Sequence, residues 1–154
     1  MKGRNEYNMR RNLKKTVVLV LVVMMCMSTF VLIAQARASL YISSFGAAAT
    51  AVGGGNVNVG YTITGTGVMD DIGSTEVHIF ERLPNSSTWN FVRVYRYSQS
   101  GNGHMLGSNK HTHSSSITYQ GTAGRQYYAI VYFWAGKNNA GDSRTSTTSV
   151  VTAY

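Results

Sequence analysis

The feature that most restricts the fold of this chain is the alternation of apolar and polar side chains between residues 56 and 64. The apolar positions are Val57, Val59, Tyr61 and Ile63. Successive side chains of a β-strand point to opposite faces, so this period of two predicts a strand with one buried face and one solvated face. After residue 38 no stretch of useful length has the 3.6-residue period of an amphipathic helix.

The rest of the chain after residue 38 has the same β character. Segments rich in Val, Ile, Tyr and Thr are separated by Gly, Ser, Thr and Asn, with only one proline, Pro84. The expected strands are residues 40–45, 56–64, 75–82, 89–97, 116–119, 126–135 and 143–153. The expected connections include a loop at 65–73, a long irregular segment at 98–115, a turn at 121–124 and a hairpin loop at 136–141. Seven short strands with this alternation predict an all-β fold, an antiparallel β-sandwich.

Three segments resemble parts of fibronectin type III and other immunoglobulin-like domains. Residues 77–92 look like the central hairpin of that family, with Trp89 just past the turn. Residues 121–131 look like the approach to its strand F, with Tyr127 where a tyrosine corner would fall, and residues 138–143 resemble its F–G hairpin. The resemblance covers about residues 40–153 and implies an immunoglobulin-like sandwich, although the paired cysteines of antibody domains are lacking.

A second resemblance concerns residues 65–73, 107–110 and 141–145. These segments look like motifs of a family of short secreted proteins of Gram-positive bacteria. That resemblance implies export and the same fold, and it implies no activity.

Residues 1–38 differ from the rest and have the pattern of a secretory signal. A basic head is followed by an apolar run from Val17 to Ala34 and by small residues two apart, at Ala34, Ala36 and Ala38. This order predicts a signal peptide with a helical apolar part, cleaved after Ala36 or Ala38, and a single mature domain at 39–154. The alternative is an uncleaved membrane anchor, because this 18-residue stretch is just long enough to span a bilayer.

Removal of the signal changes the charge of the protein. Residues 1–38 contain seven Lys/Arg and one Glu, net +6, and residues 39–154 contain seven Lys/Arg and five Asp/Glu, net +2, which together give the +8 of the chain. The excess of basic residues therefore lies mostly in the export signal, and it is no evidence for nucleic-acid binding. We expect a secreted or cell-surface protein that meets the membrane only through its signal segment.

Aromatic residues are the main candidates for a ligand site. If the odd-numbered residues of strand 126–135 face the core, its even-numbered residues line the opposite face, and residues 89, 91, 95 and 97 share one side of their own strand. Adjoining rows would form an aromatic platform for a glycan or a cell-surface protein, since flat rings stack on sugar faces. The candidate residues are Trp89, Tyr95, Tyr97, Tyr128, Tyr132 and Trp134. The alternative is ordinary core and cross-strand packing of these rings.

Two acidic and two imidazole side chains form a second candidate site, for a metal ion. Asp70 and Asp71 are the only acidic pair, and His111 and His113 fall on one side of an extended segment, with His104 as a further ligand. Carboxylates suit Ca²⁺ and imidazoles suit Zn²⁺ or Cu²⁺. The alternatives are a turn cap for the Asp pair and solvated histidines for the rest, and we expect no cofactor.

No pattern in the sequence predicts catalysis. There is no G-x-S-x-G elbow, the only cysteine is Cys26 in the signal, and the carboxylates are scattered. We therefore expect a non-enzymatic binding or structural module outside the cytoplasm. The alternatives are a metal- or carboxylate-dependent extracellular hydrolase and a small secreted toxin or bacteriocin.

Overall fold

The computed structural model describes residues 39–154; the signal peptide, its helix and its cleavage sites, predicted for residues 1–38, lie outside the described residues. Within that part the fold is antiparallel β-sheet, which confirms the all-β prediction. The strands are β1 (Ile42–Gly53), β2 (Asn56–Arg82), β3 (Asn90–Arg96), β4 (Leu106–Gln120), β5 (Gln126–Lys137), β6 (Ala140–Thr147) and β7 (Val151–Thr152). The helical element there is the three-residue 3-10 turn η2 (Gly103–Met105), so no helix of residues 39–154 is long enough to span a membrane.

Strand β2 organises the molecule because it pairs with four other strands. Its first half lies between β1 and β4, with Val59 opposite both Ala49 and Ile117. Its second half lies between β3 and β5, with Val77 opposite both Tyr95 and Val131. Strands β6 and β7 pair with the other edge of β5.

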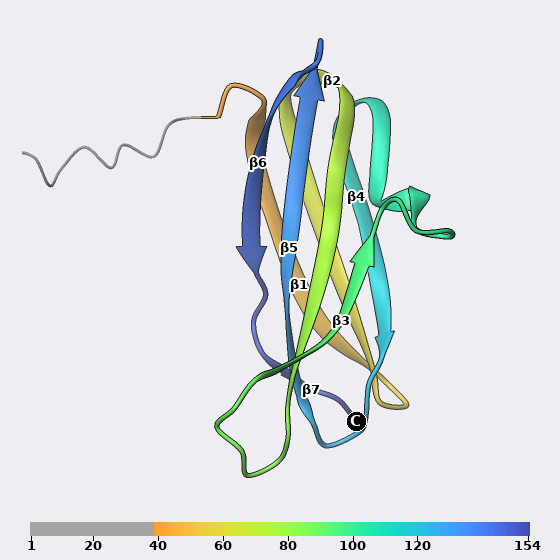
Figure 1. The fold of residues 1–154 in the computed structure, drawn as a ribbon, viewed down its shortest axis with the longest axis vertical. Coiled ribbons are helices and arrows are strands. Elements are labelled where there is room, and N and C mark those ends of the chain that lie inside the picture. The colour runs from red at the N-terminus through yellow and green to blue at the C-terminus, as the bar shows by residue number, and fades with distance from the viewer. Residues whose placement is uncertain (1–38) are drawn as a thin grey trace, which may run out of the picture. The chain divides into compact units, whose positions relative to one another are not determined.

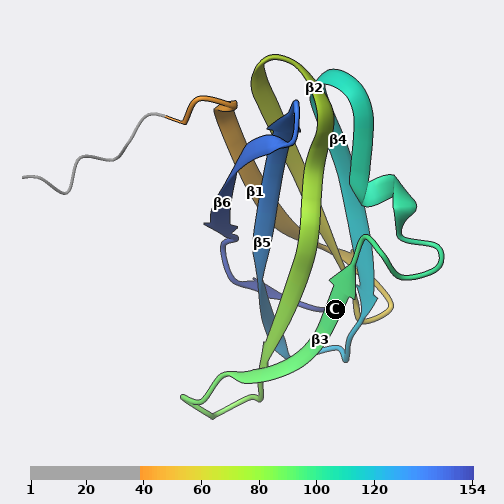
Figure 2. The same cartoon turned by 45° about the horizontal axis from the view of Figure 1, so that its top comes forward.

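Figure 1 shows β2 rising behind β5, turning over at one end of the domain and descending in front beside β5. Figure 2 shows the same turn with that end brought forward. We call the group of β1, the first half of β2 and β4 the β1 layer. The group of β3, the second half of β2, β5, β6 and β7 is the β5 layer.

Side chains from both layers meet in one core, as the alternation predicts. Val57, Val59, Tyr61 and Ile63 are all buried, and so are Val77, Ile79, Tyr127, Ala129, Val131 and Phe133. Phe133 of β5 joins the layers, since its ring centroid lies 5.4 Å from Phe45 and 6.1 Å from Tyr61. Burial of each large apolar side chain contributes about 1.5–3 kcal/mol to folding.

The prediction of a loop at residues 65–73 is wrong, because β2 runs through them without a break. The strand shifts register between Thr64 and Met69 and then pairs again with the start of β4. A β-carbon at Gly73 would lie 2.2 Å from the Met105 carbonyl oxygen, so glycine permits the close approach of the two backbones here. Glycine and aspartate suggest turns in general, whereas here they occupy a bent, paired strand.

The irregular segment predicted at 98–115 is also wrong beyond residue 105. Strand β4 covers residues 106–120, more than the predicted 116–119, although most of its side chains are exposed and polar. Likewise β1 continues through the small residues that follow 40–45. Pairing with β2 fixes both segments as strands, and that long-range pairing leaves little trace in their own composition.

The end of the chain also differs from the prediction. The last strand, expected at 143–153, is divided into β6 and β7, because Thr148 turns inward and its Oγ1 accepts a hydrogen bond from the Ala129 N–H. The hairpin loop expected at 136–141 is reduced to Asn138 and Asn139, both at positive φ, because Lys137 already pairs with Ala140. Asparagine tolerates that conformation better than other side chains do.

The structure confirms the turn predicted at 121–124. The Tyr127 side chain, near the start of β5, contacts this turn. Its hydroxyl accepts the Thr122 N–H at 2.9 Å and donates to Glu81 Oε2 at 2.6 Å. Arg125 donates to the other Glu81 oxygen at 2.8 Å. Burial raises the pKa of the Tyr127 hydroxyl, so the group stays a neutral donor.

Candidate ligand-binding face

The outward positions of the β5 layer carry a continuous set of rings. They come from alternate residues of β2 and β5, where Val77 and Ile79 point inward, and from the chain entering β3. The six residues are His78, Phe80, Trp89, Phe91, Tyr128 and Tyr132, which we call the aromatic face. Cross-strand register brings them together, since Phe80 lies opposite both Phe91 and Tyr128.

Each ring of the aromatic face contacts the next. In order, the centroid distances are 4.7 Å for Trp89–Tyr128, 4.9 Å for Tyr128–Phe80, 5.6 Å for Phe80–Phe91, 5.6 Å for Phe91–His78 and 4.7 Å for His78–Tyr132. Phe80 and Tyr128 are stacked at 4°, and most of the others meet edge to face. These arrangements are the ones that aromatic pairs favour.

The aromatic face is open to solvent. Phe91 is 54% exposed, and the other five side chains are half-buried against their neighbours. A contiguous patch of this kind on a sheet surface typically marks a place where another molecule binds.

Charged groups lie at both ends of the aromatic face. At one end the Arg82 guanidinium lies 4.7 Å from the Trp89 ring centroid and donates to Gln126 Oε1. At the other end Glu76 Oε2 lies 2.5 Å from His78 Nε2, and Glu76 Oε1 accepts from Arg96 Nε at 3.0 Å. The hydrogen bond from His78, together with those from Arg96, lowers the pKa of Glu76 and keeps it ionised.

Two hollows adjoin the Glu76 end. One, of about 190 Å³, is lined by Thr75, Glu76, Arg96, Tyr97, Ser98 and Tyr132. The second, of about 290 Å³, is lined by Asp71, Thr75, Tyr97, Leu106 and Trp134. Thr75 and Tyr97 belong to both, so the hollows extend the aromatic face toward the bend of β2.

Trp134 lies flat against a pair of glycines. A β-carbon at Gly136 would lie 2.8 Å from its indole nitrogen, and one at Gly141 would lie 2.5 Å from its ring. These two glycines face each other across β5 and β6. The missing side chains therefore make the space that the indole fills.

The structure separates the six candidate aromatic residues into three groups. Trp89, Tyr128 and Tyr132 belong to the aromatic face, and Tyr97 and Trp134 line the adjoining hollows. Tyr95 lies opposite the inward-facing Val77 and packs against the core. The expectation that it shares a side with Phe91 is wrong, because the register shift opposite Ile79 and Phe80 inserts an extra residue into β3 and reverses its alternation.

Sequence reasoning missed several residues of this face. His78 and Phe80 were not candidates, nor were the flanking Glu76, Arg82 and Arg96. Positions 76, 78, 80 and 82 alternate with the inward-facing Val77 and Ile79, and this alternation is the signal that identifies them as outward. Their contact with β3 and β5 depends on strand order, which alternation does not supply.

Three of the four candidate metal ligands have other hydrogen-bond partners. Asp70 accepts the Asn138 N–H at 2.8 Å, and Asp71 accepts the Ser108 hydroxyl at 3.1 Å. His111 is exposed, whereas His113 is buried with Nε2 3.0 Å from the His104 carbonyl oxygen. Among residues 39–154 no group of three or more His, Cys, Asp or Glu side chains could hold a metal ion. A metal site at these four positions stays a prediction.

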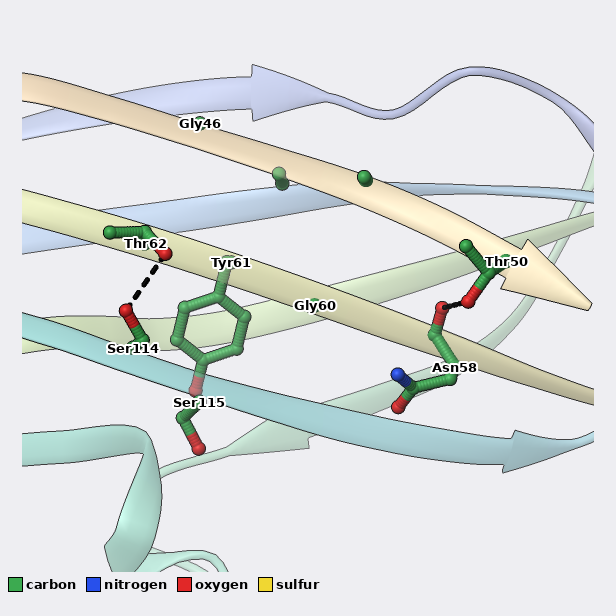
Figure 3. Close-up of a pocket in the computed structure, with 10 residues that line it drawn as sticks. Gly46, Thr50, Asn58, Gly60, Tyr61, Thr62, Ser114 and Ser115 are labelled. Atoms are coloured by element: carbon green, nitrogen blue, oxygen red, sulfur yellow. Dashed lines mark hydrogen bonds between the residues drawn. The ribbon is translucent and has the colours of Figure 1, made fainter. Parts of the chain in front are cut away.

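A larger hollow, of about 630 Å³, lies on the outer side of the β1 layer (Figure 3). Its lining consists of Gly46, Ala47, Ala48, Thr50, Asn58, Gly60, Tyr61, Thr62, Ser114 and Ser115. The Thr62 and Ser114 hydroxyls bond to each other at 2.8 Å, and Thr50 donates to the Asn58 carbonyl at 3.5 Å. This hollow has no charged lining residue, and its hydroxyls are partly engaged with one another.

Neither a family model nor a curated protein matches this sequence.

Proposed function

We propose that this protein is an exported binding module, an immunoglobulin-like β-sandwich whose aromatic face binds a glycan. The order of the strands supports the sandwich: β1, β2 and β4 form one layer, and β3, β2, β5 and β6 form the other. The hydroxyl of Tyr127, bonded to the backbone five residues upstream, matches the tyrosine corner of such domains. Membership of a family of short secreted Gram-positive proteins is part of the same proposal.

One observation carries the ligand proposal: six rings in unbroken contact on the solvent side of a sheet, with Phe91 54% exposed. A row of flat apolar surfaces suits the apolar faces of successive sugar rings. The flanking groups Arg82, Glu76 and Arg96 can bond to the sugar hydroxyls. A protein ligand on the cell surface is the alternative that remains if neither glycan in the test below binds.

The carboxylates of the domain support a binding role for the aromatic face over a catalytic one. Glu81 is tied to Arg125 and Tyr127, and Asp142 is tied to Ser39. Glu76 is the carboxylate beside the aromatic face, and it is paired with His78 and Arg96. A carboxylate held by two donors in this way suits the orientation of a ligand better than proton transfer to it.

Tryptophan fluorescence tests the proposal. The full chain is expressed with its leader in a secreting bacterial host, purified from the medium and titrated with a soluble neutral glucan and with soluble peptidoglycan fragments. We expect one of them to quench the fluorescence of Trp89 in a Trp134→Phe background, because sugars would stack beside that ring.

A matched pair of variants identifies the surface. Phe91→Ser should weaken binding about two- to tenfold, since loss of one stacked ring removes about 0.5–1.5 kcal/mol. Val52→Ser is the control, because Val52 of β1 is also 54% exposed and lies outside the aromatic face. Absence of quenching by both glycans, or equal binding by the two variants, would refute the glycan proposal.

A further inference from the structure

Ser39, the first residue after Ala38, is held to strand β6. Its hydroxyl donates to Asp142 Oδ2 at 2.6 Å, and the same carboxylate oxygen accepts the Leu40 N–H at 3.0 Å. The Ser39 oxygen in turn accepts the backbone N–H groups of Tyr41 at 3.2 Å and Ile42 at 2.7 Å. Two of these hydrogen bonds join Ser39 and Leu40 to Asp142, 102–103 positions away in the chain, and the other two fix the entry into β1.

We propose that the signal peptide is removed by hydrolysis of the Ala38–Ser39 bond and that the α-ammonium so formed pairs with the Asp142 carboxylate. Water adds across the peptide C–N bond: Ala38 leaves as the carboxylate end of the signal, and the nitrogen of Ser39 takes up a proton. The mature N-terminus is thereby built into the fold. This inference rests on the proposed export of the chain and is independent of the ligand.

Covalent geometry brings the new charge close to Asp142. The nitrogen of Ser39 is three bonds from its own Oγ and lies within about 4 Å of it. Because Oγ is 2.6 Å from Asp142 Oδ2, the ammonium lies no more than about 6.5 Å from that oxygen while this hydrogen bond holds, a separation at which opposite charges still attract each other.

Asp142 is suited to the role. The hydrogen bond from Ser39, with smaller contributions from the Leu40 N–H and Arg144, lowers its pKa and keeps it ionised. Arg144 lies two residues along the same strand and is present whether or not the signal is removed.

The geometry distinguishes the two candidate cleavage sites. Cleavage after Ala36 would leave Arg37 and Ala38 ahead of Ser39 and would move the ammonium along the chain by up to about 7 Å. The hydrogen bonds of Ser39 would then no longer hold the terminal ammonium beside the Asp142 carboxylate.

The first test is the intact mass and N-terminal sequence of the protein secreted from the full chain. We expect a product that begins at Ser39. A product that begins at Arg37 would overturn this inference alone, whereas a product that still carries residues 1–38 would overturn the proposed export as well.

The second test measures the charge pair. Insertion of Gly-Gly between Ala38 and Ser39 moves the new terminus away and leaves the Ser39 and Leu40 hydrogen bonds in place. Asp142→Asn should lower the melting temperature by about 2 °C more in the protein that begins at Ser39 than in the insertion variant. Asp71→Asn is the matched control, and equal effects of Asp142→Asn in both backgrounds would overturn the pairing.

A third measurement avoids Asp142 variants altogether. A carboxylate nearby favours the protonated form of an amine, and only the neutral amine reacts with an ester. An amine-reactive ester at pH 7 should therefore label the α-amine of the natural product about threefold more slowly than that of the insertion variant. Equal labelling rates would count against the pair even if the cleavage site is Ser39.

Discussion

The outer faces of the two layers follow the same alternation and carry opposite chemistry. On the β5 layer the outward residues of β2 are Glu76, His78, Phe80 and Arg82, and rings from β3 and β5 join them. On the β1 layer the outward residues of the same strand are Asn58, Gly60 and Thr62, beside small residues of β1 and hydroxyls of β4. One strand therefore contributes to an aromatic, charged surface and to a small, uncharged one. Alternation decides which residues face outward, and side-chain size and charge decide what each face can bind.

The largest expected effect concerns Phe133, which holds the two layers together. Phe133→Ala removes a fully buried ring and its contacts with Phe45 and Tyr61, and should lower the free energy of unfolding by about 3–5 kcal/mol. Phe91→Ala on the open face should cost less than about 1 kcal/mol, because much of that ring is already in solvent. Urea unfolding measures both, and equal losses would mean that the layers are not joined through Phe133.

A pair of glycines compares the two outer faces directly. Gly141→Ala should destabilise the protein by about 2 kcal/mol and shift the Trp134 emission, because the new β-carbon would lie 2.5 Å from the indole. Gly60→Ala should be neutral or stabilising by about 0.5 kcal/mol, since no atom lies within 4 Å of a β-carbon there. Thermal melts and fluorescence spectra measure both effects. A destabilising Gly60→Ala would show that the outer side of the β1 layer is more tightly packed than the hollow there indicates.

The smallest effect is a pH dependence from His113, near the bend where β4 follows β2. Burial lowers its pKa, and the neighbouring Lys110 and His104 lower it further against the opposing hydrogen bond to the His104 carbonyl. The unfolded chain then binds this proton at a higher pH than the folded protein, so stability is full above the ordinary pKa of about 6.5 and declines as pH falls below it.

Melting temperatures between pH 7.5 and 5.5 test this dependence, in a range above the titration of the carboxylates. The wild-type protein should lose more stability over that range than His113→Gln does. The opposite order, or a melting temperature that rises on acidification in both, would contradict the buried neutral histidine.

The success of the sequence predictions depended on how local their signals were. Val57, Val59, Tyr61 and Ile63 were correctly predicted to share a buried face, since period-two alternation is a property of a single strand. For strand 126–135 the same alternation separated two rows of side chains without deciding which row is buried. The turn at 121–124 was also predicted correctly, because the glycines that indicate it lie within the turn itself. Segments 65–73 and 106–115 were missed, because polar, glycine-containing chain becomes strand there only by pairing with a distant partner.

The candidate site was predicted in part. Trp89, Tyr128 and Tyr132 belong to the aromatic face, as the two-row hypothesis anticipated, whereas one extra residue in β3 turned Tyr95 inward. A bulge leaves no mark in composition and yet exchanges the two faces of a strand.

By itself the sequence determined that this chain forms half-buried strands and which of their residues share a face, because side chains alternate along a strand whatever its partners are. Tertiary structure alone decided that β2 bends through both layers, that His78 and Phe80 join the rings of β3 and β5, and that Asp142 meets Ser39. Those outcomes depend on strand order and register, which arise from contacts between residues tens of positions apart.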